Sequence, residues 1–234
     1  AFLESFQNAA GVIYRSNLVR NFIHHAMGEK KKEFTIPGGF NIDLLKFSNH
    51  IFQTPQGAYI VGEKTWLYAN TLGPENGLRE SFIYFDQNAP SDSILLIAGA
   101  PQEERWSAIE DSREKLDFFN EDRFVQLGTP SEIEVLSLLK TCGTYINLSC
   151  FPYYSDLAMI ASVYGSHIIC SDATVEREIF GNNCTVIQNS TIALDKDFKN
   201  NHLDLYNGVT PTLEEIGIVN VCKKYVSAIE SILR

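Results

Sequence analysis

The chain has 234 residues, of which 44% are hydrophobic and 21% are charged, values that are ordinary for a soluble globular protein. Its formal net charge is −10, whereas general nucleic-acid-binding proteins are usually basic, so we expect no nucleic-acid partner. The longest apolar runs are far shorter than a membrane span, so we expect no transmembrane segment. The five cysteines lack paired Cys-x-x-Cys spacing, and we interpret them as reduced thiols of a cytoplasmic protein, not as metal ligands.

Residues 1–50 differ in pattern from the rest of the chain. Gly11–Tyr14 is a candidate strand, and Leu18–Ala26 is a candidate helix. Lys30–Lys32 is the one basic cluster, which we interpret as a solvated loop, with a peripheral contact to a membrane surface as the alternative. The segment Phe34–Phe47 contains Pro37 and two glycines, and by itself it indicates a turn.

Strands and helices alternate from residue 57 onward. This alternation predicts βαβ units and a doubly wound α/β fold, in which a six-stranded, mainly parallel sheet carries helices on both faces. The expected strands are Gly57–Gly62, Ser93–Ala98, Arg123–Leu127, Tyr145–Leu148, His167–Cys170 and Cys184–Ile187. Two of the expected helices begin at Gly73-Pro74 and at Thr129-Pro130. The others span Glu103–Phe118, Ser155–Tyr164, Val175–Phe180 and Thr212–Leu233. In the last of these, the residues expected to face inward are Ile216, Val219, Tyr225, Ile229 and Ile232.

The most informative stretch is Tyr145–Asp172, which reads as strand, loop, helix, glycine and strand. Ser155 is the expected N-cap of this helix, and Gly165 is expected to end it. A loop that leads from a sheet into a helix N-terminus is where α/β proteins bind anionic ligands. We therefore expect a ligand at the carboxyl edge of the strands.

An ordered series of motifs resembles the donor-binding half of two-Rossmann-domain (GT-B) glycosyltransferases, in particular family 4. Ser149, Gly165 and the surrounding strand-loop-helix frame are similar to that family's donor segment, and Pro37–Asp43 resembles its Pro-Asn-Gly-Val-Asp connector. The resemblance implies that residues 1–50 are a connector and the remnant of an acceptor-side domain, and that residues 51–234 are a Rossmann-like nucleotide-sugar-binding domain. Further similar positions are Gly62, Leu72–Gly77, Ile97, Gly99, Phe124, Leu127, Gly128, Glu132, Ser171, Asp172, Glu178, Ile179 and Gly181.

The resemblance also implies a function. The substrate would be a nucleotide-diphosphate sugar, with no metal or other cofactor, and a missing acceptor-binding half or partner protein would bind a carbohydrate or other acceptor. Lys64 and Arg79 are candidates for stabilising the leaving phosphate, although surface lysines and arginines are commonly only solvated. The donor-binding candidates are Gly62, Gly99, Gly128, Thr129, Ser149, Tyr153, Tyr154, Ser155 and Glu178.

Four positions depart from the family's pattern. Glu63 and Asn76 stand near the places of a basic pair that binds phosphate, and Pro152 and Ile160 stand where the family has two glutamates. Three functions are therefore open. The first, which we favour, is a glycosyltransferase donor domain; the second is a catalytically degenerate scaffold or partner-binding module. The third is an unrelated doubly wound domain that binds a small phosphorylated ligand.

Overall fold

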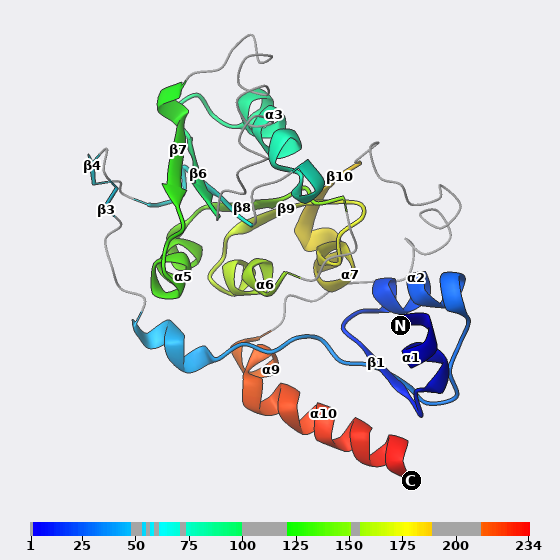
Figure 1. Ribbon diagram of the computed structural model, residues 1–234. Helices are drawn as coiled ribbons and strands as arrows, with labels where there is room; N and C mark the ends of the chain where they lie inside the picture. The colour runs from blue at the N-terminus through cyan, green and yellow to red at the C-terminus, as the bar shows by residue number, and fades with distance from the viewer. Residues whose placement is uncertain are drawn as a thin grey trace.

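The computed structural model describes residues 2–47, 53–54, 57–58, 61–70, 74–99, 121–150, 155–188 and 212–234. Within them, six strands form one parallel sheet in the order β10-β9-β8-β5-β6-β7 (Figure 1). The predicted doubly wound α/β sheet is thus confirmed. Its strands are β5 (Thr65–Ala69), β6 (Ile94–Ala98), β7 (Phe124–Gly128), β8 (Thr144–Asn147), β9 (His167–Ser171) and β10 (Cys184–Ile187).

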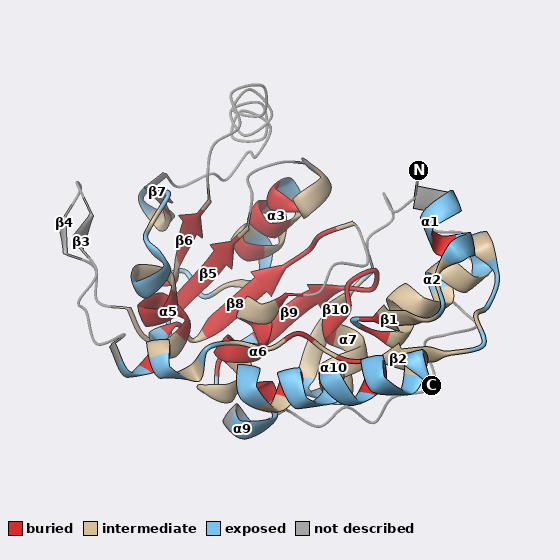
Figure 2. Ribbon diagram, turned by 60° about the horizontal axis from the view of Figure 1, so that its bottom comes forward, coloured by how far each residue is buried: buried red, intermediate tan, exposed pale blue. Residues whose placement is uncertain are grey.

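Both faces of the sheet are apolar, since its strands are near-continuous hydrophobic runs. In β6, Leu95 packs in the cluster on the α3 side, whereas its neighbour Leu96 packs with the cluster on the α5 and α6 side. The sheet is therefore buried between two helical layers, as Figure 2 shows. The helices of these layers are α3 (Leu78–Asn88) on one face and α5 (Glu132–Thr141), α6 (Asp156–Val163) and α7 (Glu176–Phe180) on the other.

The first strand of the sheet is not where the sequence predicted it. The expected strand Gly57–Gly62 is wrong: Gly57–Ala58 is the short strand β4, which pairs antiparallel with β3 (Gln53–Thr54). The strand that enters the sheet is β5, which is buried at every residue. Because Gly62 precedes β5, it lies at the amino end of that strand instead of its carboxyl end. The predicted helix Glu103–Phe118 lies outside the described residues.

Residues 2–47 form a small module beside the main sheet. Strand β1 (Val12–Tyr14) pairs in parallel with β2 (Glu33–Thr35), and α2 (Asn17–Met27) connects them, so the strand and helix predicted here are confirmed. Helix α1 (Phe2–Asn8) precedes them. Short 3₁₀ turns are η1 (Ile42–Phe47) at the end of the module, and η2 (Pro74–Asn76), η4 (Glu121–Arg123) and η5 (Gly181–Asn183) in the main unit.

The C-terminal helix is broken in two. Helix α9 (Leu213–Ile216) ends at Gly217, and α10 (Ile218–Leu233) follows. At the break, the Phe40 N–H donates to the Ile216 carbonyl and the Ile218 N–H donates to the Phe40 carbonyl, each at 2.8 Å. Ile216 is buried as predicted, but Val219 and Ile229, predicted inward, are exposed. Val221 and Ala228 are buried instead, against Ile36, and Tyr225 packs beside them.

No helix among the described residues is long and apolar enough to cross a bilayer.

Candidate functional site

The order in which the sheet is built reverses between β5 and β8. The chain runs outward from β5 through β6 to β7, then returns to place β8, β9 and β10 on the other side of β5. Open α/β sheets bind ligands outside the carboxyl ends of their strands at such a point of reversal. Here those ends are Asn70, after β5, and Asn147–Ser149, at the end of β8. We call this region the carboxyl edge.

The loops that follow β5 and β8 are fastened to each other. Gly77 has a φ of +70°, and a Cβ atom added there would lie 1.9 Å from the Leu148 carbonyl oxygen, so only glycine fits this approach. The Cys150 N–H donates to the Glu75 carbonyl at 3.0 Å, and the Ser149 hydroxyl donates to the same oxygen at 3.3 Å. These bonds give the carboxyl edge a fixed backbone, although Ser149, a predicted donor-binding residue, is itself buried.

Helix α6 begins at the carboxyl edge as predicted. Ser155 is its N-cap and accepts the Ala158 N–H at 3.2 Å, because a hydroxyl there satisfies a backbone donor that has no partner within the helix. The Tyr145 and Ser155 hydroxyls are 3.1 Å apart. In the first turn, the Asp156 carboxylate lies 2.9 Å from the Arg15 guanidinium of the N-terminal module. An acidic side chain thus already lies at the positive end of this helix.

A buried carboxyl, which no local sequence pattern singles out, lies behind the carboxyl edge. Glu176, at the start of α7, is fully buried and accepts a hydrogen bond from the Asn147 amide at 2.6 Å. Burial, partly offset by the bond from Asn147, raises the pKa of Glu176 to about 7. Asn147 in turn accepts the Ser149 N–H at 3.4 Å, and the Ser171 hydroxyl donates to the Ser149 carbonyl. This network supports the loop after β8 from below.

The predicted position of Lys64 at the ligand edge is wrong. Lys64 directly precedes β5 and forms an ion pair with Asp92, which lies just before β6. Gly62 accepts a hydrogen bond from the Gly143 N–H at 2.9 Å, and Gly143 precedes β8. Gly62, Glu63 and Lys64 therefore lie at the amino edge of the sheet, opposite the carboxyl edge. The displacement follows directly from the misplaced first strand.

Three other predicted residues, Gly99, Gly128 and Thr129, do lie at the carboxyl ends of strands. Gly99 follows β6, and its N–H donates to the Gly128 carbonyl at the end of β7 at 2.9 Å. Thr129 follows and is exposed. Arg79 is exposed in the first turn of α3, which begins after β5 ends, so it remains near the ligand edge. Tyr153 and Tyr154, like Pro152, lie outside the described residues.

Glu178 makes a contact that differs from the predicted donor contact. Its two carboxylate oxygens accept the N–H groups of Asn17 and Leu18, at 2.8 and 2.7 Å, at the first turn of α2. The carboxylate therefore satisfies backbone donors at the positive end of that helix. Glu178 ties the N-terminal module to α7 and is not directed to a nucleotide in this arrangement.

The segment that follows β5 carries no cationic side chain. No Lys or Arg occurs in the sequence between Ala69 and Leu78, which covers the region directly after the first strand of the sheet. Asn76 contributes its carbonyl oxygen, which accepts from the Tyr68 hydroxyl at 3.2 Å, and Ile160 is fully buried in the core. The described residues contain no group of three or more His, Cys, Asp or Glu side chains that could hold a metal ion.

Comparison with solved structures gives the fold a precedent. No protein-family model matches the sequence, and no curated protein matches it. HepE of Anabaena in complex with UDP has a TM-score of 0.68 and 15% identity over 97% of this chain. A glycosyltransferase of Rickettsia africae has a TM-score of 0.66 and 14% identity over the whole chain, and the GtfA/B complex has a TM-score of 0.64 and 12% identity over 98% of it.

These similarities cover nearly all of this chain but only part of each solved structure. The chain spans 65% of HepE, 67% of the Rickettsia protein and 47% of the matched GtfA/B chain. At identities of this size the likeness concerns the fold, which is the Rossmann-like fold found in GT-B glycosyltransferases.

Proposed function

From a fold shared with GT-B glycosyltransferases, we propose that this chain binds a nucleotide-diphosphate sugar at its carboxyl edge and serves as the donor-binding half of a glycosyltransferase. The acceptor side would come from a further α/β unit beside the β1–β2 pair, in the same protein or in a partner. Residues 1–50 would then be the connector to that unit, and residues 51–234 the donor-binding domain. Transfer by this chain alone would be weak or absent, and with the acceptor side restored it would need no metal.

The observation that carries the proposal is the fixed backbone at the point where the sheet order reverses. The bonds from Ser149 and Cys150 to the Glu75 carbonyl hold the loops after β5 and β8 together, and α3 and α6 start beside them. Helix N-termini at such an edge favour the negative charge of a diphosphate. HepE, whose fold is similar, was solved with UDP and with UDP-glucose.

A second function is favoured by the charges at the same edge. Lys64 lies at the opposite edge, Asp156 occupies the first turn of α6, and Glu178 is bonded to α2. Among the described residues that were candidates for neutralising a leaving phosphate, Arg79 is the one that still lies near this edge. A catalytically degenerate module, which keeps the fold and binds a partner, accounts for these contacts without a nucleotide.

Calorimetric titration with UDP, GDP and ADP separates the two functions. If the chain binds a donor, one diphosphate should bind with a measurable heat, and Arg79→Ala should weaken that binding by about ten- to a hundredfold, because a hydrogen bond to a charged group is lost. Lys64→Ala is the matched control, since it removes a cation from the opposite edge and should leave the affinity unchanged.

The possible results lead to different conclusions. A Lys64→Ala effect as large as that of Arg79→Ala would contradict the assigned edge. If the folded chain binds none of the three diphosphates at millimolar concentration, the degenerate module replaces the enzyme as the function of this chain.

A further inference from the structure

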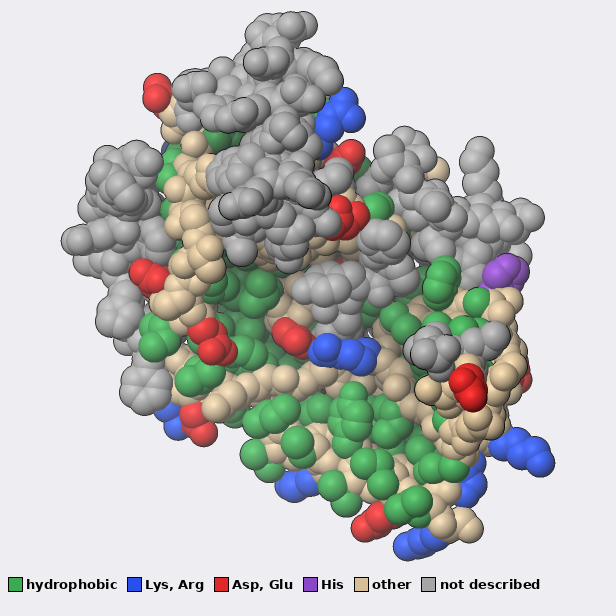
Figure 3. Space-filling view, viewed as in Figure 1, with side chains coloured by type: hydrophobic (Ala, Val, Ile, Leu, Met, Phe, Trp, Pro, Cys, Tyr) green, Lys and Arg blue, Asp and Glu red, His purple; other side chains and the backbone are tan. Residues whose placement is uncertain are grey.

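Helix α10 carries two apolar faces, and only one of them is covered by described residues. On the inner face, Val221 and Ala228 are buried against Ile36. On the outer face, Val219 is 66% exposed, Val226 55%, Ile229 47% and Leu233 78%. Figure 3 shows hydrophobic side chains gathered over this helix at the surface of the molecule. A contiguous apolar surface of this kind marks an interaction site in a soluble protein.

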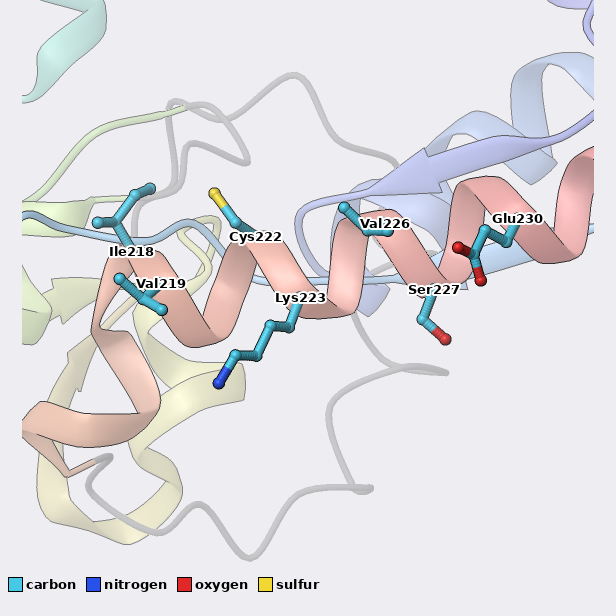
Figure 4. Close-up of a pocket in the computed structure, with 7 residues that line it drawn as sticks. All are labelled: Ile218, Val219, Cys222, Lys223, Val226, Ser227 and Glu230. Carbon is cyan, nitrogen blue, oxygen red and sulfur yellow. The ribbon is translucent and has the colours of Figure 1, made fainter.

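The exposed residues follow a regular spacing. Val219, Cys222, Val226, Ile229 and Leu233, which we call the outer stripe, are separated by three, four, three and four residues. This is the a and d spacing of a heptad repeat, the pattern by which one helix packs along another. Several of these side chains line a shallow pocket on the helix together with Lys223 and Glu230 (Figure 4).

We propose that the outer stripe binds the outer stripe of a second copy of this chain, with the two α10 helices antiparallel about a twofold axis. In an antiparallel pair, a positions oppose d positions. Val226 of one copy then packs on Ile229 of the other, and Cys222 packs on Leu233, so that the twofold axis generates four apolar layers. An interface of this kind is self-complementary, as a twofold dimer requires.

The charges beside the outer stripe select this arrangement. Lys223 and Glu230 both occupy e positions, seven residues apart on the same side of the helix. In antiparallel pairs e positions face e positions, so Lys223 of each copy meets Glu230 of the other, and the pair occurs twice per dimer. In a parallel pair both side chains would face g positions, occupied by Ile218, Tyr225 and Ile232, and no charge pair would form.

The helix is held in position for this contact. The inner face is anchored in the cluster with Ile36, and the Lys32 ammonium donates to the Ile232 carbonyl at 2.7 Å near the end of α10. Little ordering is then needed on association, which reduces its cost. The inference is independent of nucleotide binding, because the outer stripe is on α10 and not at the carboxyl edge.

Sedimentation velocity over a range of protein concentrations tests the proposal. The chain should dimerise, and Lys223→Glu should weaken dimerisation by about tenfold, because it places like charges opposite each other twice. Glu230→Lys should weaken it similarly. The double variant Lys223→Glu/Glu230→Lys should restore the affinity, which a general effect on folding or net charge would not do.

A substitution within the outer stripe tests the proposed dimer independently of the charge substitutions. Ile229→Glu should weaken dimerisation by about a hundredfold, because it buries an unpaired carboxylate in the interface. Ile133→Glu is the matched control, since Ile133 is 39% exposed on α5 and lies outside the stripe. A chain that stays monomeric at several hundred micromolar overturns the proposal. So does a dimer that Ile229→Glu leaves intact, because its interface then lies elsewhere.

Discussion

Glu176 is the residue whose ionisation should affect stability most visibly. Its pKa is raised from an ordinary value near 4.5 to about 7, mainly by complete burial. The folded state therefore favours the protonated form, so this stabilisation is full below pH 4.5 and is lost as the pH rises through 7. The shift corresponds to about 3 kcal/mol of unfolding free energy between these limits. We expect Glu176→Gln, which resembles the protonated side chain, to remove this pH dependence.

The measurement is denaturant unfolding of the wild type and Glu176→Gln from pH 4.5 to 8. The difference in unfolding free energy should favour the variant increasingly as the pH rises, because other titrating groups cancel in the comparison. A difference that stays constant across this range would show that the pKa of Glu176 is the same in the folded and unfolded states.

Gly77 should be the least replaceable of the glycines at the carboxyl edge. An alanine there would adopt a φ of +70° and place its Cβ 1.9 Å from the Leu148 carbonyl oxygen. We expect Gly77→Ala to cost about 2–5 kcal/mol in unfolding free energy, from backbone strain and steric overlap together. Gly165→Ala isolates the strain, since Gly165 has a φ of +89° but no atom near its Cβ position, and it should cost about 1–2 kcal/mol. Equal losses in the two variants would contradict the close approach.

At the scale of elements, helix α5 shows how a start signal shifts by two residues. The sequence predicted a helix that begins at Thr129-Pro130, which would make Thr129 the cap, whereas Ser131 is the N-cap and forms a capping box with Glu134. Ser131→Ala should therefore destabilise the protein by about 1 kcal/mol, because the Glu134 N–H in the first turn loses its side-chain acceptor. Thr129→Ala should change the unfolding free energy by less than about 0.5 kcal/mol. Thermal or denaturant unfolding of both variants checks the assignment, and a reversed order would restore Thr129 as the cap.

The strands that sequence could predict are those enclosed by clear turn signals. β6, β7 and β10 are apolar runs that end near a glycine or begin after a loop, and their bounds agree with prediction to within a residue. β5 was missed because Gly57–Gly62, just before it, has comparable β-branched and aromatic content. Local propensity does not show which of two neighbouring runs enters a sheet, since packing in the sheet decides that.

The candidate site was less predictable than the fold, because the positions of its residues also depend on tertiary packing. Ser155 was found because a cap depends only on nearby residues. Lys64 was placed at the wrong edge because its position depended on the choice of the first strand. The contact of Glu178 with α2 joins residues 160 and 161 positions apart, which no local pattern reveals. The raised pKa of Glu176 could not be predicted, because it depends on how deeply the folded protein buries that side chain.

At the scale of the whole molecule, polar contacts connect the N-terminal module to the helices of the main sheet. They include Glu178 with the start of α2, Arg15 with Asp156, and the Lys140 ammonium with the Leu45 carbonyl. We expect Glu178→Ala to leave the α2 N–H groups of Asn17 and Leu18 without their acceptor and to speed their exchange. Hydrogen exchange read out by mass spectrometry should show lost protection over α2 and unchanged protection over β5 and β8.

The exposed Arg15–Asp156 pair provides the comparison for that experiment. An ion pair with both side chains in contact with water contributes little, so Arg15→Ala should change the exchange of α2 far less than Glu178→Ala. Equal effects would show that the ion pair holds the module as strongly as Glu178 does.

The packing of α10 on the β1–β2 pair has a consequence during synthesis. Lys32 and Ile232, which meet in the folded protein, are 200 residues apart. At translation rates of roughly 5–20 residues per second, the β1–β2 pair emerges from the ribosome roughly 10–40 s before the helix that covers it. Through that interval a parallel pair with an uncovered apolar face is available to chaperones and to other nascent chains on the same polysome. The β1–β2 pair is thus made well before α10 but is completed only once α10 has been made.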